Sequence, residues 1–171
     1  LLAASGGRLG IVTAAARHHR ARRLALQGLC CLDVQGAGAL ELVLEFIRQG
    51  REDPQTIAEA ERMLLSAYAV RDRADALLAG QSTHWDVARM ALVDRNVLRL
   101  AVWELMARHA PRKVVISEAV RLAKEFSTAE SGRCINGVLD AASRRLDELD
   151  DQQHGRDDKD LSLIHISEPT R

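Results

Sequence analysis

The chain has 171 residues, which suits one domain, and 47% of them are hydrophobic, enough to build a core. Aromatic residues make up only 3%, while Ala and Leu are abundant, a composition that favours packed helices over a β-sandwich. The 24 Lys and Arg residues balance the 24 Asp and Glu residues. The net charge of the chain is therefore zero and cannot be used to argue that it binds nucleic acid.

The elements are expected in the following order. Residues 1–16 are predicted to be a disordered or foreign lead. A basic segment at 17–23 then leads into an apolar helix that ends near residue 32. A second helix covers about residues 40–50. A long third helix begins at Asp53-Pro54, where Asp caps the helix and Pro occupies its first turn, and runs to Gly80.

Residues 81–84 are predicted to be a linker, followed by a short helix from Asp86 to about residue 92. A helix from near Asp94 to before Pro111, another over about 113–126 and a last one, capped by Ser131 and ending near 146, complete the domain. Residues 147–171 form an acidic tail, predicted to be disordered, and the last eleven are expected to be non-native. The prediction is therefore an all-α fold of about seven helices within residues 17–146.

Four blocks of this domain stand in a specific order. They are Ala21-Arg22-Arg23-Leu24-Ala25-Leu26-Gln27-Gly28-Leu29; Trp85-Asp86-Val87-Ala88-Arg89-Met90 with Val93-Asp94-Arg95, Leu98-Arg99-Leu100 and Glu104-Leu105; Pro111-x-x-Val114-x-Ile116-Ser117-Glu118-Ala119-Val120-x-Leu122-Ala123-Lys124; and Ser131-Gly132-Arg133-Cys134-Ile135-Asn136-Gly137-Val138-Leu139. Each block alone is a weak signal, but the order and separation of all four are specific. Together the blocks resemble the bacterial transcription antitermination factor NusB family.

The resemblance implies a compact double bundle that binds RNA and carries out no chemistry. The implied ligands are a short single-stranded leader RNA, the boxA element, and a ribosomal protein of the small subunit, also called NusE. Through that pair the family acts on RNA polymerase indirectly and supports transcription of ribosomal RNA operons. No cofactor, metal or membrane is expected, and a homodimer is compatible with the sequence.

The candidate RNA-binding residues form two groups. The first is a cationic cluster at the start of the first apolar helix, which would neutralise phosphates: Arg17, His18, His19, Arg20, Arg22 and Arg23. The second surrounds the turn before the last helix, which by resemblance completes the RNA groove: Phe126, Glu130, Ser131, Arg133 and Cys134. The alternatives are a solvated charge run for the first group, core packing for Phe126 and a small buried residue for Cys134.

Asp94, Arg95 and Arg99 lie on the polar side of their amphipathic helix. The resemblance assigns this surface to the protein partner, and a surface ion-pair network is the alternative. Trp85 and Trp103 are expected to anchor the core. Asn136 is expected to bond a neighbouring backbone group, and Gly137 to allow close approach of another helix.

Three departures from the family pattern bear on RNA contact. Arg23 replaces a usual Glu, while Cys30 and Cys134 replace aromatic residues. Because stacking on an aromatic ring holds a single-stranded base by roughly 1–3 kcal/mol, we expect weaker or altered RNA contact, or compensation by charge.

The sequence shows no nucleophile, phosphate-binding loop or metal-ligand spacing, and the carboxylates are expected on solvated faces. Three cysteines without a Cys-x-x-Cys pattern indicate a reducing, cytoplasmic setting. No apolar run reaches the roughly 20 residues of a membrane span. Two alternatives remain open: the helical module of an RNA cytosine methyltransferase, and a helical interaction module that does not bind RNA.

Overall fold

A computed structural model describes residues 6–80 and 86–164, and within them the fold is all-α. Two short 3₁₀ turns, Ala37–Ala39 and Val87–Arg89, accompany the helices. The seven α-helices are α1 Gly6–Gln35, α2 Leu40–Arg48, α3 Pro54–Ala69, α4 Arg71–Ala79, α5 Leu92–Met106, α6 Arg112–Phe126 and α7 Ala129–Ile164. The predicted all-α class with about seven helices is confirmed.

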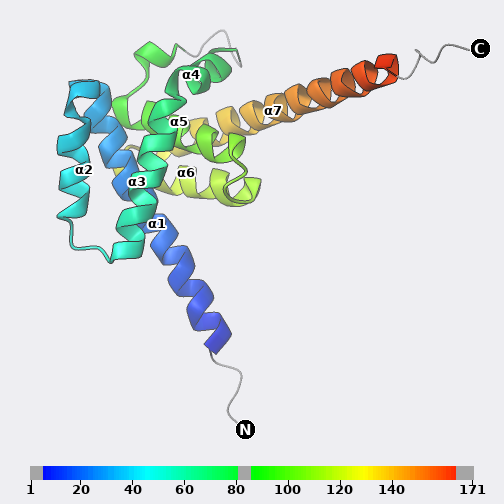
Figure 1. Cartoon of the computed structure of the whole chain (residues 1–171). Coiled ribbons are helices and arrows are strands. Elements are labelled where there is room, and N and C mark those ends of the chain that lie inside the picture. The colour runs from blue at the N-terminus through cyan, green and yellow to red at the C-terminus, as the bar shows by residue number, and fades with distance from the viewer. Residues whose placement is uncertain (1–5, 81–85, 165–171) are drawn as a thin grey trace, which may run out of the picture.

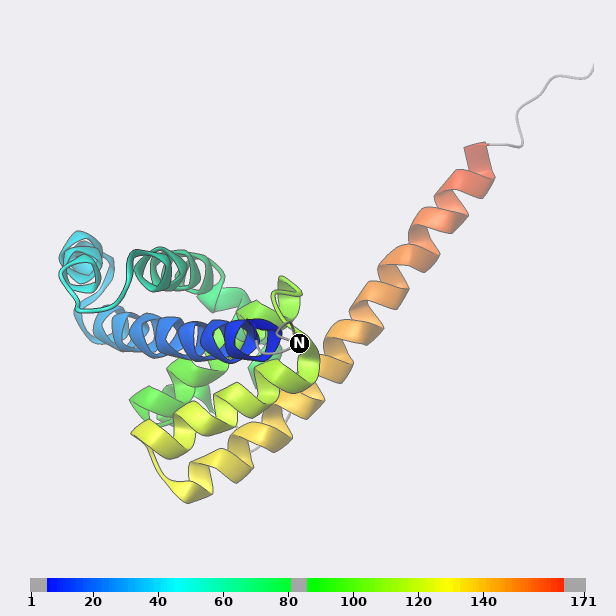
Figure 2. The ribbon, with the colours of Figure 1, turned by 90° about the horizontal axis from the view of Figure 1, so that it is seen from below.

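The helices form two groups that share α5 (Figure 1). Helices α1, α2 and α3 pack on one another on one side, and α6 and α7 form an antiparallel hairpin on the other. Helix α5 contacts α1, α3, α4, α6 and α7, so it is the central element of the core. From below, the second half of α7 leaves the body as a single helix (Figure 2).

The start of α3 was predicted correctly, and its cause is visible. Asp53 is the N-cap, and its Oδ1 accepts hydrogen bonds from the backbone N–H groups of Gln55 (3.1 Å) and Thr56 (3.0 Å). The predicted continuous helix to Gly80 is wrong, because Val70 leaves helical geometry at φ −103° and ψ 9°. Arg71 stabilises the break by donating to the Tyr68 carbonyl at 2.7 Å.

The helix ends differ from prediction at three places. Helix α1 already begins at Gly6 and α7 continues to Ile164, so helical backbone extends into both segments that were predicted to be disordered. The division into lead, domain and tail stays a prediction. The last helix begins at Ala129, and Ser131 does not cap it: Thr128 Oγ1 accepts from the Ser131 N–H at 3.1 Å and takes that role.

Among the described glycines, Gly28 of α1 is the one most tightly surrounded by neighbouring helices. A Cβ on Gly28 would lie 2.8 Å from Cδ2 of Leu64 in α3 and 3.2 Å from Cγ1 of Val43 in α2. The prediction for Gly137 is wrong, because nothing lies within 4 Å of the corresponding position. Trp103 is buried as predicted, whereas Trp85 and the linker 81–84 lie outside the described residues.

A helix long and apolar enough to cross a bilayer is missing from the described part of the chain.

Candidate nucleic-acid interface

The cations of residues 17–23 point in different directions because consecutive residues of a helix lie on different faces. Arg20 faces the loop before α3, where its Nε lies 3.0 Å from Glu52. Arg17 donates to Gln55 at 3.0 Å, and His18 Nδ1 lies 2.6 Å from Glu59 of α3. These three residues therefore contact α3 and its preceding loop, away from α6 and α7.

Arg22 lies in the interior of the protein. Its side chain is 5% exposed, that of Glu104 in α5 is 2% exposed, and Nε and Nη2 donate to the two Glu104 oxygens at 2.9 and 2.8 Å. Burial alone would lower the pKa of Arg22, but the hydrogen bond and negative charge of Glu104 outweigh it and raise that pKa. The guanidinium thus has an internal partner and faces the core.

Two side chains of the basic segment, His19 and Arg23, reach the end of α6. His19 Nδ1 lies 2.7 Å from Glu118, and its Nε2 lies 3.3 Å from Glu125. Arg23 Nε lies 2.9 Å from Glu125, and its guanidinium stands 5.4 Å from the ring centroid of Phe126. Phe126 is half-buried against the core, as the core-packing alternative expects, and its contact with RNA stays a prediction.

The turn after Phe126 is rich in hydroxyl groups. Ser131 Oγ donates to Asp94 Oδ2 of α5 at 2.9 Å, and it lies 2.9 Å from Thr128 Oγ1 and 3.1 Å from Ser127 Oγ. The second Asp94 oxygen, Oδ1, is buried and has no hydrogen-bond partner among the described residues. This cluster fixes the start of α7 to the start of α5.

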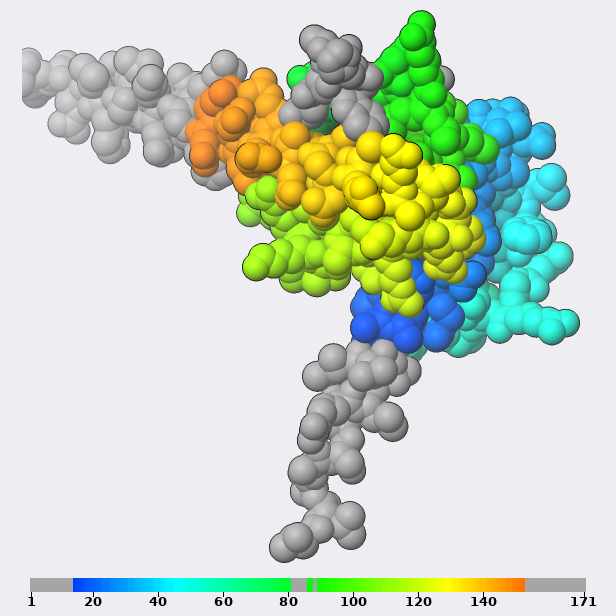
Figure 3. All heavy atoms as spheres, turned by 180° about the vertical axis from the view of Figure 1, so that it is seen from behind, coloured from blue at the N-terminus to red at the C-terminus, as the bar shows by residue number. Residues whose placement is uncertain are grey.

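The structure brings part of the predicted groove together. The beginning of α7 lies over α6, with α1 at their edge (Figure 3). Glu130, Arg133 and Cys134 are exposed on the first turns of α7, so the interpretation of Cys134 as a small buried residue is wrong. His19 and Arg23 lie at this edge because both contact Glu125 of α6. Arg20 and Arg22 do not face it, because they contact Glu52 and Glu104. Contact of any of these residues with RNA stays a prediction.

Asn136 was expected to bond a backbone group. Its Nδ2 instead donates to the Asp140 side chain one turn later, at 3.4 Å and in an exposed position. Asn136 and Gly137 are both exposed, so this pair does not form the helix contact that was expected.

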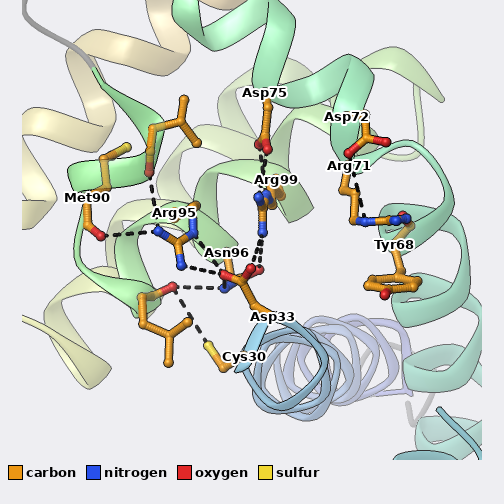
Figure 4. A network of polar contacts seen from close by, with 12 residues as sticks. Cys30, Asp33, Tyr68, Arg71, Asp72, Asp75, Met90, Arg95, Asn96 and Arg99 are labelled. Carbon is orange, nitrogen blue, oxygen red and sulfur yellow. Dashed lines mark hydrogen bonds and ion pairs between the residues drawn. The ribbon is translucent and has the colours of Figure 1, made fainter. Parts of the chain in front are cut away.

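The polar residues of α5 form an ion-pair network with α1 and α4 (Figure 4). Asp33 of α1 accepts hydrogen bonds from Arg95 at 2.8 Å and from Asn96 at 2.9 Å, and lies 3.0 Å from Arg99. Arg99 also donates to both oxygens of Asp75 in α4, at 2.8 and 2.6 Å. Arg95 and Arg99 therefore belong to an ion-pair network, as the alternative to partner binding predicted. Whether they also bind a partner stays a prediction.

These contacts change the acidity of the groups involved. Burial alone would raise the pKa of Asp33, but hydrogen bonds from Asn96, Arg95 and Arg99 lower it below its ordinary value. The hydrogen bond to Asp75 raises the pKa of Arg99, against the effect of burial. Burial raises the pKa of the Cys30 thiol to about 11, so Cys30 is a neutral thiol and a poor nucleophile at neutral pH.

Sequence reasoning missed the carboxylates that hold these cations. Glu104, Glu118, Glu125, Asp33 and Asp75 were expected on solvated faces, yet Glu104 is buried and the other four are half-buried or involved in ion pairs. Glu104 could have been found, because it lies seven residues after buried Val97 and so shares its face of α5.

The described side chains contain no group of three or more His, Cys, Asp or Glu residues placed to hold a metal ion. All three cysteines are free thiols.

Comparison with known proteins gives a consistent family. The model of the NusB family matches residues 19–144. A transcription antitermination protein NusB of Sorangium cellulosum is 41% identical over 130 residues, which cover 75% of this chain and 93% of that protein. Its Streptomyces coelicolor counterpart is 42% identical over 128 residues, covering 72% of this chain and 90% of that protein. These relatives are named as antitermination proteins and not as enzymes.

Solved structures agree with this fold. NusB of T. maritima superposes with a TM-score of 0.68 at 31% identity, covering 74% of this chain and 90% of that one. A NusB chain from a crystal structure of antitermination factors NusB and NusE in complex with dsRNA superposes with a TM-score of 0.65 at 23% identity, covering 76% and 98% of the two chains. At that identity the second match supports the fold alone.

Proposed function

Because this chain belongs to the NusB family, we propose that it is a transcription antitermination factor that binds single-stranded boxA RNA together with the ribosomal protein NusE. The pair would act on the RNA polymerase elongation complex indirectly and support ribosomal RNA transcription in the cytoplasm. The observation that carries this proposal is the family match over 19–144, which includes the basic segment from His19 onward and the turn at Ser131. RNA and NusE are chosen as partners because membership of this family implies them.

The RNA would lie along the edge where α1 meets the start of α7. Arg23, over the ring of Phe126, and exposed Arg133 are the cations best placed for phosphates at this edge. Cys134 stands where the family has an aromatic residue, and Phe126 is the nearest aromatic residue to it in the sequence. With Arg23, Phe126 offers a surface on which a base can stack. Arg23 would thus compensate by charge for the missing aromatic residues.

NusE would bind where α5 begins. One Asp94 oxygen, Oδ1, is buried and has no hydrogen-bond partner within the part of the chain that the structure describes, and the next residue, Arg95, is paired with Asp33. Because this oxygen is buried, the junction between α5 and α7 would have to open locally before a donor of NusE could satisfy it. Since Ser131 bonds the other Asp94 oxygen, RNA and NusE would meet at neighbouring atoms.

One observation favours a second function, a helical interaction module without RNA binding. The basic side chains at 18, 19, 20 and 23 have acidic neighbours within 3.3 Å, and Arg22 is buried against Glu104. RNA phosphates would have to compete with these carboxylates, which lowers the affinity that charge alone can give.

Binding of a boxA RNA, measured by fluorescence anisotropy with and without NusE over a salt series, separates the two functions. We expect Arg23→Ala and Arg133→Ala each to weaken binding by about tenfold or less and to reduce the salt slope by about one. Arg48→Ala is the matched control, because Arg48 pairs with Glu61 on the far side of α3. No binding, even with NusE, would favour the interaction module, whereas equal affinity of the parent and all three variants would show that RNA does not bind at this edge.

A further inference from the structure

A separate cavity of about 640 Å³ lies at the other end of the α6–α7 hairpin. It is lined by Arg73 of α4, by the end of α5, by the connection to α6 and by α7 from Ser143 to Asp150. Arg112 begins α6 and Phe126 ends it, so the 15-residue helix places this cavity about 20 Å from the edge proposed for RNA. It is therefore independent of the proposed boxA site.

The rim of this cavity is cationic. Arg73, Arg108 and Arg112 come from three different elements and line the same space. A guanidinium offers several N–H donors in a planar fork that matches the oxygens of a phosphate. Three such groups around one cavity favour an anionic ligand.

Arg108 has a backbone conformation that is unfavourable for a non-glycine residue, which indicates that its side chain has a role. Its φ of 49° lies in the left-handed region, and no other non-glycine residue among those described is positive in φ. Arg108 comes after Ala107, the C-cap of α5. The N–H of the next residue, His109, donates to the Glu104 carbonyl at 3.0 Å. Glycine is the usual residue at this position of a helix end. Its side chain is 80% exposed, so packing does not explain why an arginine stands there.

Two carboxylates of α7 that also line the cavity pair with these arginines. Asp150 Oδ2 lies 2.8 Å from Arg108 Nη2, and Asp147 Oδ2 lies 3.5 Å from Arg112 Nη1. Ion pairs this exposed contribute about 1 kcal/mol or less, so a phosphate group can displace them.

The rest of the lining is suited to the remainder of a nucleotide. Leu105, Met106, Ala110, Pro111 and Leu146 give an apolar floor, and Ser143 adds a largely buried hydroxyl. Carboxylates are the groups that accept hydrogen bonds from ribose hydroxyls in nucleotide sites. The volume lies within the range of small-molecule sites, about 300–1,000 Å³.

We propose that this cavity binds a nucleotide, with its phosphate on Arg108 and Arg112 in place of Asp150, its base on the apolar floor and its ribose near Asp147. The nucleotide can be a free nucleoside phosphate or one residue of a single-stranded RNA, since both present the same three parts.

Binding of 5′-AMP and of the oligomer (rA)₆ to the full chain, measured by isothermal calorimetry at low salt, tests this site. Arg108→Gly removes the guanidinium and relieves the backbone strain, so the melting temperature should hold or rise while affinity falls about tenfold, the effect of one charged hydrogen-bonding group. Asp150→Asn should raise affinity, because it removes the competing anion. Arg89→Ala, a similarly exposed arginine outside the cavity, and Arg133→Ala at the proposed RNA edge should change nothing for AMP.

Binding of AMP with this variant pattern supports a free nucleotide as the ligand. Binding of (rA)₆ alone with the same response to Arg108→Gly supports an RNA residue. The proposal is overturned if AMP and (rA)₆ both fail to bind, or if Arg108→Gly leaves the affinity unchanged. It is also overturned if inorganic phosphate displaces AMP at equal concentration, because the apolar floor and the ribose contact would then add nothing to binding. Loss of boxA binding in Arg133→Ala bears on the other site only.

Discussion

The buried Arg22–Glu104 pair provides the sharpest test of how α1 is held in the bundle. Glu104→Gln removes the negative charge but keeps the shape, and it leaves a guanidinium that is 5% exposed with only Glu118 nearby, at 3.7 Å. Breaking one partner of a buried ion pair costs about 3–5 kcal/mol, because the remaining charge has lost both solvent and partner. We expect a loss of this size in the free energy of unfolding.

Urea denaturation of four proteins measures the effect: the parent, Glu104→Gln, Arg22→Met and the double variant. The two single losses should not add, and the double variant should recover part of the stability, because it leaves no unpaired charge in the core. The exposed Arg48–Glu61 pair, at 2.6 Å, is the control and should give about 0–1 kcal/mol in the same cycle. Additive losses at Arg22 and Glu104, or a loss below about 1 kcal/mol for Glu104→Gln, would refute the reasoning.

Three further predictions concern stability, each measured by thermal or urea unfolding. Gly28→Ala should cost about 1–2 kcal/mol because its methyl group meets fully buried Leu64, whereas Gly137→Ala, with nothing within 4 Å, should add up to about 1 kcal/mol; equal effects would contradict the packing. Asp33→Asn should flatten the pH profile in acid: the folded pKa is lowered, so its contribution is complete above the unfolded value near 3.9 and is lost as pH falls toward the folded pKa. An unchanged acid limb would argue against the network. Asp53→Ala should cost about 1 kcal/mol through loss of the α3 cap, and Asp53→Asn much less.

The all-α fold follows from features that act locally. Asp53-Pro54 specifies the start of α3 through its own hydrogen bonds, and apolar spacing specifies the buried faces of α5 and α6. The break at Val70 could not be predicted from such features. It depends on Arg71 reaching back to the Tyr68 carbonyl and lying over the Tyr68 ring at 4.1 Å, contacts that the apolar pattern does not record.

The site was predictable only in part, for a related reason. A run of basic residues reads as one patch in the sequence, but on a helix it is distributed over three directions. Which cation meets α3, α5 or α6 depends on the rotation of α1, which is fixed by tertiary packing such as the close approach at Gly28 to Leu64. The carboxylate partners lie as far away in the chain as Glu125 lies from His19, a separation of 106 residues, so local patterns cannot assign them.

The distribution of the basic segment separates residues that can exchange partners from those that cannot. An ion pair at the surface is worth little, so Arg23, with 41% of its side chain exposed, can leave Glu125 for a phosphate at small cost. Arg22 cannot, because moving it would leave Glu104 charged and alone in the core. Loss of RNA binding in an Arg22 variant would therefore report first on the position of α1. Arg22→Lys distinguishes the two roles: it keeps the charge but loses the bidentate geometry, so it should lower stability even without RNA. Parent-like unfolding of Arg22→Lys, together with weaker boxA binding, would instead assign Arg22 a direct contact.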